Sequence, residues 1–185
     1  PDSGALLDPR DRADDAIAHA ISTAFDRRDS VLFDQPTANG ALWFQGSNYK
    51  ACFDAAGWQF AARPASSDAP ALPVQFRTTA LSMGGTPIGV DDVMPVREGM
   101  RVEYRHGAFV EAIEMRLGEV EQTFRFDRLA NRGDLVLTVD ATSSRIGADL
   151  GDGIVFRSDT GDVRYSEAVA IDAAGARVRA ETTLE

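Results

Sequence analysis

From Ser30 onward the sequence alternates apolar and polar residues, and this period of two is the feature that most constrains the fold. Short runs such as ALWFQG, YKACFD, RVEYR and GIVFRS are separated by turn segments such as AAG, HG, NRGD and GDG. A period of two places successive side chains on opposite faces of a strand, and Gly and Asp suit the tight turns between strands. We therefore expect an all-β fold, a β-sandwich of about a dozen short, mainly antiparallel strands over residues 31–185.

The first 30 residues follow a different pattern. Asp8 suits an N-cap position, Pro9 suits the first helical turn, and alanine, isoleucine and phenylalanine residues recur after them at helical spacing. We expect one N-terminal helix over about residues 10–27, within a helical segment 1–30 that precedes the β-sandwich domain.

The composition argues against two classes of partner. The 185 residues include 29 acidic side chains and 19 Lys or Arg, a formal net charge of −10, which opposes contact with phosphate backbones and anionic lipid. No apolar run reaches the length of a membrane-spanning helix. We expect neither nucleic-acid binding nor a membrane span.

The single cysteine, Cys52, excludes an intrachain disulfide. Its place in a predicted strand favours a small buried hydrophobe over a nucleophile, which would need a nearby base. The two histidines, His19 and His106, are both expected to be solvated, and they are too far apart in the sequence for a zinc-ligand motif.

The segment from residue 100 to 127 allows a register to be written down. A two-residue hairpin loop at the HG pair would place Val102 opposite Glu111, and a second at the LG pair would place Ile113 opposite Gln122. The alternation then predicts an apolar face that carries Val102, Tyr104, Phe109, Glu111, Ile113, Met115, Val120, Gln122, Phe124 and Phe126. The opposite face is charged and solvated, and it carries Arg101, Glu103, Arg105, Glu114, Arg116, Glu119, Glu121, Thr123, Arg125 and Asp127.

Two carboxylates of the charged face, Glu119 and Glu121, have the approximate spacing of the catalytic pair of an inverting glycosidase, about 7 Å. Any two residues that stand two apart on a strand have the same spacing. Arginines on this face would keep both groups ionised, so we expect them to be solvated, with Arg116 as a cross-strand partner.

Polar residues on the apolar face are the more informative feature. Tyr104, Glu111 and Gln122 interrupt a hydrophobic row, and a buried carboxylate is costly unless it is hydrogen-bonded. We expect the three to bond to one another or to a basic group. Two interpretations stay open: a core network that fixes the register, or the polar floor of a binding cleft lined by a sheet.

Aromatic residues and acidic turns are the other candidate sites. Trp43, Tyr49 and Trp58 would suit an aromatic platform for sugars, although core packing is the favoured alternative. Acidic residues in glycine turns are candidates for a calcium site, which would need the turns to converge. These residues are Asp149, Asp152, Asp159 and Asp162. No other cofactor is expected, and the two similar segments FDAAGW and IDAAGA are explained by turn chemistry without a true repeat.

The runs GALWFQGSNYKACFDAAGWQF, YRHGAFVEAIEMRLGEVEQTFRF and VRYSEAVAIDAAGARVRA carry a family resemblance. Together they resemble an uncharacterised N-terminal β domain of large secreted or surface bacterial proteins, those with β-propeller-like, FG-GAP or PKD-type repeats. The resemblance implies a secreted or cell-envelope location and further domains in the same chain. It implies no catalytic residues.

These observations lead to an expected function. We expect a non-catalytic extracellular module of a larger bacterial exported protein, serving surface display, adhesion or the binding of a glycan or protein partner. One alternative is a glycan-active hydrolase, or its accessory domain, that uses Glu111 with Tyr104 and Gln122; it requires Glu111 to line an open cleft. Another alternative is a pro-domain or folding-assistance segment.

Overall fold

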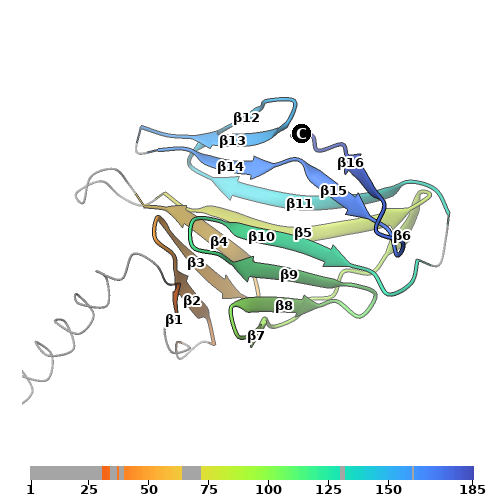
Figure 1. The fold of residues 1–185 in the computed structure, drawn as a ribbon, viewed down its shortest axis with the longest axis horizontal. Helices are drawn as coiled ribbons and strands as arrows, with labels where there is room; N and C mark the ends of the chain where they lie inside the picture. Colours follow the sequence, from red (N-terminus) through yellow and green to blue (C-terminus); the bar gives the residue numbers. More distant parts are fainter. Residues whose placement is uncertain (1–30, 34–36, 38–39, 64–71, 130–131, 160) are drawn as a thin grey trace, which may run out of the picture. The chain divides into compact units, whose positions relative to one another are not determined.

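The structure, a computed structural model, describes residues 31–33, 37, 40–63, 72–129, 132–159 and 161–185. Residues Val31–Glu185 form one compact unit. The described residues form 16 strands and no helix, and every strand pairing is antiparallel (Figure 1). The prediction of an all-β antiparallel fold is confirmed. The predicted N-terminal helix lies outside the described residues.

The strands are arranged in four sheets. Sheet A has the order β1 (Leu32–Phe33), β2 (Leu42–Gln45), β3 (Tyr49–Asp54), β4 (Gly57–Ala62), β5 (Val74–Met83) and β11 (Leu135–Ser143), with β6 (Thr86–Ile88) paired to β5. Sheet B has the order β10 (Val120–Arg125), β9 (Val110–Met115), β8 (Arg101–Arg105) and β7 (Val96–Glu98). Sheet C contains β12 (Ile146–Asp149), β13 (Gly153–Arg157) and β14 (Val163–Ser166), and sheet D contains β15 (Ala168–Ile171) and β16 (Arg177–Ala180).

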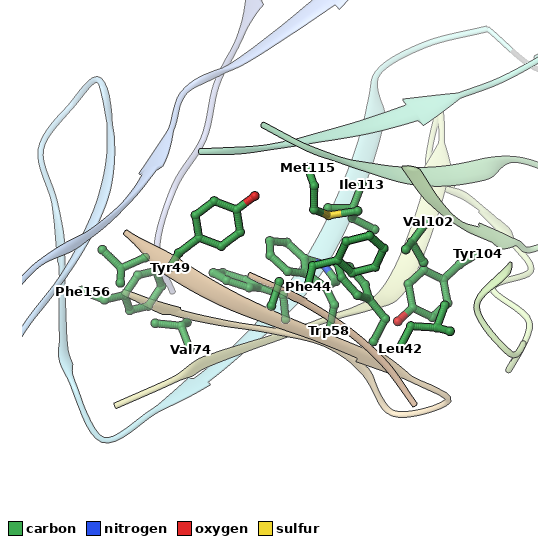
Figure 2. Close-up of a cluster of buried hydrophobic side chains, with 14 of the residues drawn as sticks. Leu42, Phe44, Tyr49, Trp58, Val74, Val102, Tyr104, Ile113, Met115 and Phe156 are labelled. Carbon is green, nitrogen blue, oxygen red and sulfur yellow. The ribbon is translucent and has the colours of Figure 1, made fainter. Parts of the chain in front are cut away.

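One hydrophobic core lies between sheet A and sheets B and C. The inner face of sheet A contributes Leu42, Phe44, Tyr49, Ala51, Phe53, Trp58, Val74 and Phe76. Sheet B contributes Val102, Tyr104, Ile113 and Met115, and sheet C contributes Ile154, Phe156 and Val163. Figure 2 shows Phe44 and Trp58 of sheet A directed toward Met115 and Ile113 of sheet B. Alternation buries one face of strands such as β2 and β5, as the period of two predicts, whereas every residue of β15 is exposed.

Sheet A is completed by a pairing between strands that are distant in the sequence. Strand β11 pairs with β5 from Leu135 opposite Met83 to Ser143 opposite Val74, with an irregularity between Thr138 and Val139. The other edge of β5 is shared by β4 and β6. An extra residue in one strand shifts the register locally, so the same faces stay buried on both sides of the irregularity.

The two predicted hairpin registers have different outcomes. The second is confirmed, because Gln122 lies opposite Ile113. The first is wrong by two residues: Val102 lies opposite Ile113, and Tyr104 lies opposite Glu111. The two-residue turn is formed by Gly107 and Ala108, one residue later than predicted, and it is closed by the His106 N–H, which donates to the Phe109 carbonyl at 3.0 Å. A shift of two residues preserves the faces of a strand, so the predicted apolar face is unaffected.

One residue of the predicted solvated face is buried. Glu103 lies between Arg101 and Arg105, at 2.9 Å from the Nε atom of each. Burial alone would raise the pKa of Glu103, but the hydrogen bonds and charges of the two arginines outweigh it and hold the pKa below its usual value. The expectation of a wholly solvated charged face is therefore wrong at this position.

The two Asp-Ala-Ala-Gly segments form turns of the same local type in different sheets. Asp54 accepts a hydrogen bond from the N–H of Ala56 at 2.8 Å, and Asp172 accepts one from the N–H of Ala174 at 2.9 Å. The shared sequence therefore reflects a shared turn, in which an aspartate side chain caps the backbone two residues on.

Candidate functional site

The predicted polar cluster is centred on Glu111 of β9, whose side chain points into the core. Glu111 is 3% exposed. Its Oε1 atom accepts a hydrogen bond from Nε2 of Gln122 at 2.7 Å, and its Oε2 atom accepts one from Oγ1 of Thr78 at 2.8 Å. The predicted bond between Glu111 and Gln122 is confirmed, and both carboxylate oxygens have a donor.

The network continues from Gln122 to sheet C. The hydroxyl of Tyr165 donates to Oε1 of Gln122 at 2.6 Å. Burial, followed by the nearby charge of Glu111, raises the pKa of Tyr165 to about 12, so this hydroxyl stays protonated as a donor at neutral pH. A single chain of hydrogen bonds therefore runs from sheet C through sheet B to Thr78 of sheet A.

His106 is buried beside Glu111, and the prediction that it is solvated is wrong. Its ring stacks on Phe109 with centroids 4.6 Å apart, which draws the imidazole into the interior. Its Nδ1 atom lies 2.7 Å from the carbonyl oxygen of Asp91 and must donate, because a carbonyl can only accept. Its Nε2 atom lies 3.5 Å from Oε2 of Glu111, long for a hydrogen bond but within the range of an ion pair.

The surroundings of His106 favour its charged form. Burial alone would lower the pKa of His106, but the interactions with Glu111 and with the Asp91 carbonyl outweigh it, and the pKa lies above its usual value. A neutral ring with its proton on Nδ1 would turn the Nε2 lone pair toward the Glu111 carboxylate. This arrangement is repulsive, whereas a protonated Nε2 is attracted to the carboxylate. We refer to Thr78, His106, Glu111, Gln122 and Tyr165 as the Glu111 network.

Tyr104 has a different role from the one predicted. Its hydroxyl lies 2.6 Å from the carbonyl oxygen of Gly57 and 3.1 Å from that of Asp54, and not on Glu111. It thereby holds the β3–β4 turn of sheet A from the opposite sheet. Burial, followed by the charge of Glu111, raises the pKa of Tyr104, so the hydroxyl remains a donor.

A small pocket lies beside the network. Its lining includes His106, Glu111, Tyr104, Asp91 and Arg77, and its volume is about 20 Å³. This volume is sufficient for one or two water molecules and too small for a sugar ring. Glu111 thus borders a small, partly open recess, which is not a cleft large enough for the sugar ring that the hydrolase alternative requires.

The carboxylates on the opposite side of the hairpin are solvated. Glu119 and Glu121 both form ion pairs with Arg116, and at least half of each side chain is exposed. The predicted cross-strand partner, Arg116, is present, and this face of the strand is exposed to solvent.

The three aromatic residues of the predicted platform do not lie on one surface. Tyr49 and Trp58 are buried in the core, where Trp58 stacks on Phe76 with ring centroids 4.6 Å apart. Trp43 lies on the outer face of sheet A and is 37% exposed. Core packing therefore describes two of the three residues, and only Trp43 is accessible.

The acidic turns considered for calcium do not converge. Asp149 and Asp152 lie before β13, whereas Asp159 and Asp162 lie after it, so the five residues of that strand, about 16 Å, separate them. Asp149 accepts from the N–H of Gly151 at 2.7 Å, and Asp152 pairs with Arg164. Within the described ranges, no group of three or more potential ligand side chains is close enough to hold a metal ion.

Cys52 is buried, as predicted, but on the outer face of sheet A, opposite Trp43 in the β2–β3 pairing. Burial, followed by the charge of Asp54, raises the pKa of its thiol to about 11. At neutral pH the group is a thiol, which is a poor nucleophile.

The comparisons with known proteins gave no match: neither a family model, nor a curated protein, nor a solved structure is similar to this chain. The resemblance to an N-terminal β domain of bacterial surface proteins therefore stays a prediction. In the part of the chain that the structure describes, no helix has the length and hydropathy needed to span a membrane.

Proposed function

We propose that residues 31–185 are a non-catalytic β-sandwich module that binds a glycan or protein partner. The resemblance noted in the sequence adds that the module belongs to a larger exported bacterial protein and serves in display or adhesion. The layered packing of sheet A against sheets B and C supports the β-sandwich assignment.

The observation that carries the proposal is the contrast between Glu111 and Trp43. Both carboxylate oxygens of Glu111 are hydrogen-bonded within the core, so the residue acts as a structural link between sheets. Trp43 places a large aromatic ring on an outer sheet face, where aromatic residues are typical anchors of binding surfaces. Binding is thereby assigned to the outer face of sheet A, and the Glu111 network holds the sheets together.

The experiment uses bacterial envelope preparations as the probe and the labelled full chain as the reporter. We expect the wild type to bind and Trp43→Ala to bind more weakly, whereas Glu111→Gln, measured well below its melting temperature, binds like the wild type. Failure of the wild type to bind any envelope preparation would contradict the proposal.

A parallel assay addresses the hydrolase alternative. The wild type and Glu111→Gln are each incubated with a panel of chromogenic glycosides. We expect the same rate of release with either protein as with buffer alone. Release that depends on Glu111 would replace the binding proposal with the hydrolase.

A further inference from the structure

The outer face of sheet A carries a row of side chains across five adjacent strands. The pairings place them side by side in the order Trp43 of β2, Cys52 of β3, Gln59 of β4, Gln75 of β5 and Thr142 of β11. Adjacent strands are about 4.8 Å apart, so the row is about 19 Å long. We call these five residues and their neighbours Gln45 and Lys50 the Trp43 face.

The Trp43 face gathers amide side chains. The chain contains five glutamines, and three of them lie on this face: Gln45 on β2, Gln59 on β4 and Gln75 on β5. Among the described residues, the side chains of Gln45 and Gln59 make no hydrogen bond, and that of Gln75 makes one long bond of 3.3 Å to the carbonyl of Ala56. Each amide offers two donor hydrogens and one acceptor oxygen, so the face presents uncommitted groups of both kinds.

The charge of the Trp43 face differs from that of the whole chain. The chain has a formal net charge of −10, yet the face contains no carboxylate and one cation, Lys50, the only lysine in the sequence. The acids nearest in register are already engaged: Asp54 caps its own turn, and Asp140 accepts from Thr79 at 3.1 Å. A nearly neutral surface on an acidic molecule suits an uncharged or weakly anionic ligand better than a basic one.

From this arrangement we infer that the Trp43 face binds a carbohydrate chain. A sugar ring has an apolar C–H face that can lie on the Trp43 indole, and hydroxyl groups that both donate and accept. Amides match such hydroxyls without the desolvation cost of a charged group. The linear row lies across the strands and allows contact with successive sugar units. This inference rests on the proposed binding function and specifies the ligand class and the residues.

Trp43 also provides a direct signal for the test. The chain has two tryptophans, and the other, Trp58, is buried in the core. A ligand that covers the indole of Trp43 should therefore protect the accessible part of the fluorescence from acrylamide quenching.

The test uses the full chain and an array of oligosaccharides of three types: neutral hexose, N-acetylhexosamine and uronic acid. We expect binding to at least one type, protection of Trp43 from quenching by that oligosaccharide, and affinity about tenfold lower in Trp43→Ala and in Gln59→Ala. The matched control is Ile146→Ala, which removes an exposed apolar side chain from sheet C and should bind like the wild type. Equal melting temperatures exclude misfolding of the variants as the cause.

A second arm separates this inference from the proposed function. Envelope preparations are treated either with periodate, which cleaves sugar diols, or with protease, before the binding measurement. If periodate abolishes binding and protease does not, the result supports a carbohydrate ligand. If protease abolishes binding and periodate does not, the inference is overturned but the proposed binding function stands. The inference is likewise overturned if the wild type forms a dimer through Trp43 and binds no oligosaccharide.

Discussion

Replacement of the Glu111 carboxylate by an amide should destabilise the protein without changing its architecture. Glu111→Gln keeps the shape of the side chain, but the amide can accept at only one of its two ends. One of the two donors, Thr78 or Gln122, then faces an N–H₂ group, and His106 loses its charged partner at 3.5 Å. A hydrogen bond to a charged group contributes about 1.5–3 kcal/mol, and an unsatisfied buried donor costs about 1–3 kcal/mol.

These terms give an expected loss of about 3 kcal/mol in the free energy of unfolding, or a decrease of about 6–12 °C in melting temperature for a domain of this size. The measurement is urea denaturation followed by tryptophan fluorescence and by circular dichroism, near pH 6. Glu119→Gln is the matched control, because Glu119 is exposed on the opposite face, and it should change stability by less than about 0.5 kcal/mol. If Glu111→Gln does not fold, Thr78→Val tests the same network by the removal of one donor.

The pH dependence checks the role of His106. A histidine whose pKa is raised by folding contributes stability that is fully present below its unfolded pKa, about 6.5, and is lost as pH rises through its higher folded pKa. The stability difference between wild type and Glu111→Gln should therefore be larger near pH 6 than above the folded pKa of His106. Equal unfolding curves for Glu111→Gln and Glu119→Gln would refute the network argument, and a difference independent of pH would refute the charged state of His106.

Three further predictions concern single residues. Gly57 and Gly175, the glycines of the two Asp-Ala-Ala-Gly turns, both have positive φ. A Cβ at Gly57 would lie 2.2 Å from the carbonyl oxygen of Phe76. A Cβ at Gly175 would meet no atom within 4 Å. Urea denaturation should show a loss of about 1–2 kcal/mol for Gly175→Ala and a clearly larger loss for Gly57→Ala. Tyr104→Phe removes the donor to the Gly57 carbonyl and should cost about 1–2 kcal/mol by thermal denaturation; no loss would contradict the role of this bond. The Cys52 thiol, with its pKa of about 11, should resist alkylation at pH 8 in the native state and react in urea; rapid native labelling would contradict its burial.

The faces of the strands could be predicted from the sequence because alternation is a local property. The apolar row through Ile113 and Gln122 lies as the period of two predicts, including the polar residues within it. The register of the β8–β9 hairpin could not be predicted, because a tertiary contact decides which two residues form its turn. His106 stacks on Phe109 inside the protein, so Gly107 and Ala108 form the turn in place of the His-Gly pair.

The candidate site was predicted only where its partners are close in the sequence. Gln122 and Glu111 belong to one hairpin, and their bond follows from its register. Thr78 and Tyr165 belong to β5 and β14 in other sheets, and no local pattern connects them to Glu111. Nothing in the sequence around Thr78 or Tyr165 distinguishes them from ordinary strand residues.

The alternation of residues along the strands already indicated which aromatic residues are buried and which are exposed. The aromatic-platform hypothesis did not take this alternation into account. In YKACFD and GWQF, the Asp-Ala-Ala-Gly turn sets Phe53 opposite Trp58, which places both on the apolar face. Trp43 alternates with Leu42 and Phe44, and it must face the other way. The burial of Trp58 and the exposure of Trp43 are both consistent with this alternation.

The long-range pairing of β5 with β11 determines the order in which this fold can form. Residues 84–134 separate the two strands, and the whole of sheet B lies within that interval. During synthesis the strands of sheet B therefore leave the ribosome while one edge of β5 still lacks β11. A strand edge without its partner can pair with another chain, and a contact across a long segment forms slowly. The emergence of Leu135–Ser143 is thus the step that closes sheet A, and until then one edge of β5 is open to pairing with another chain.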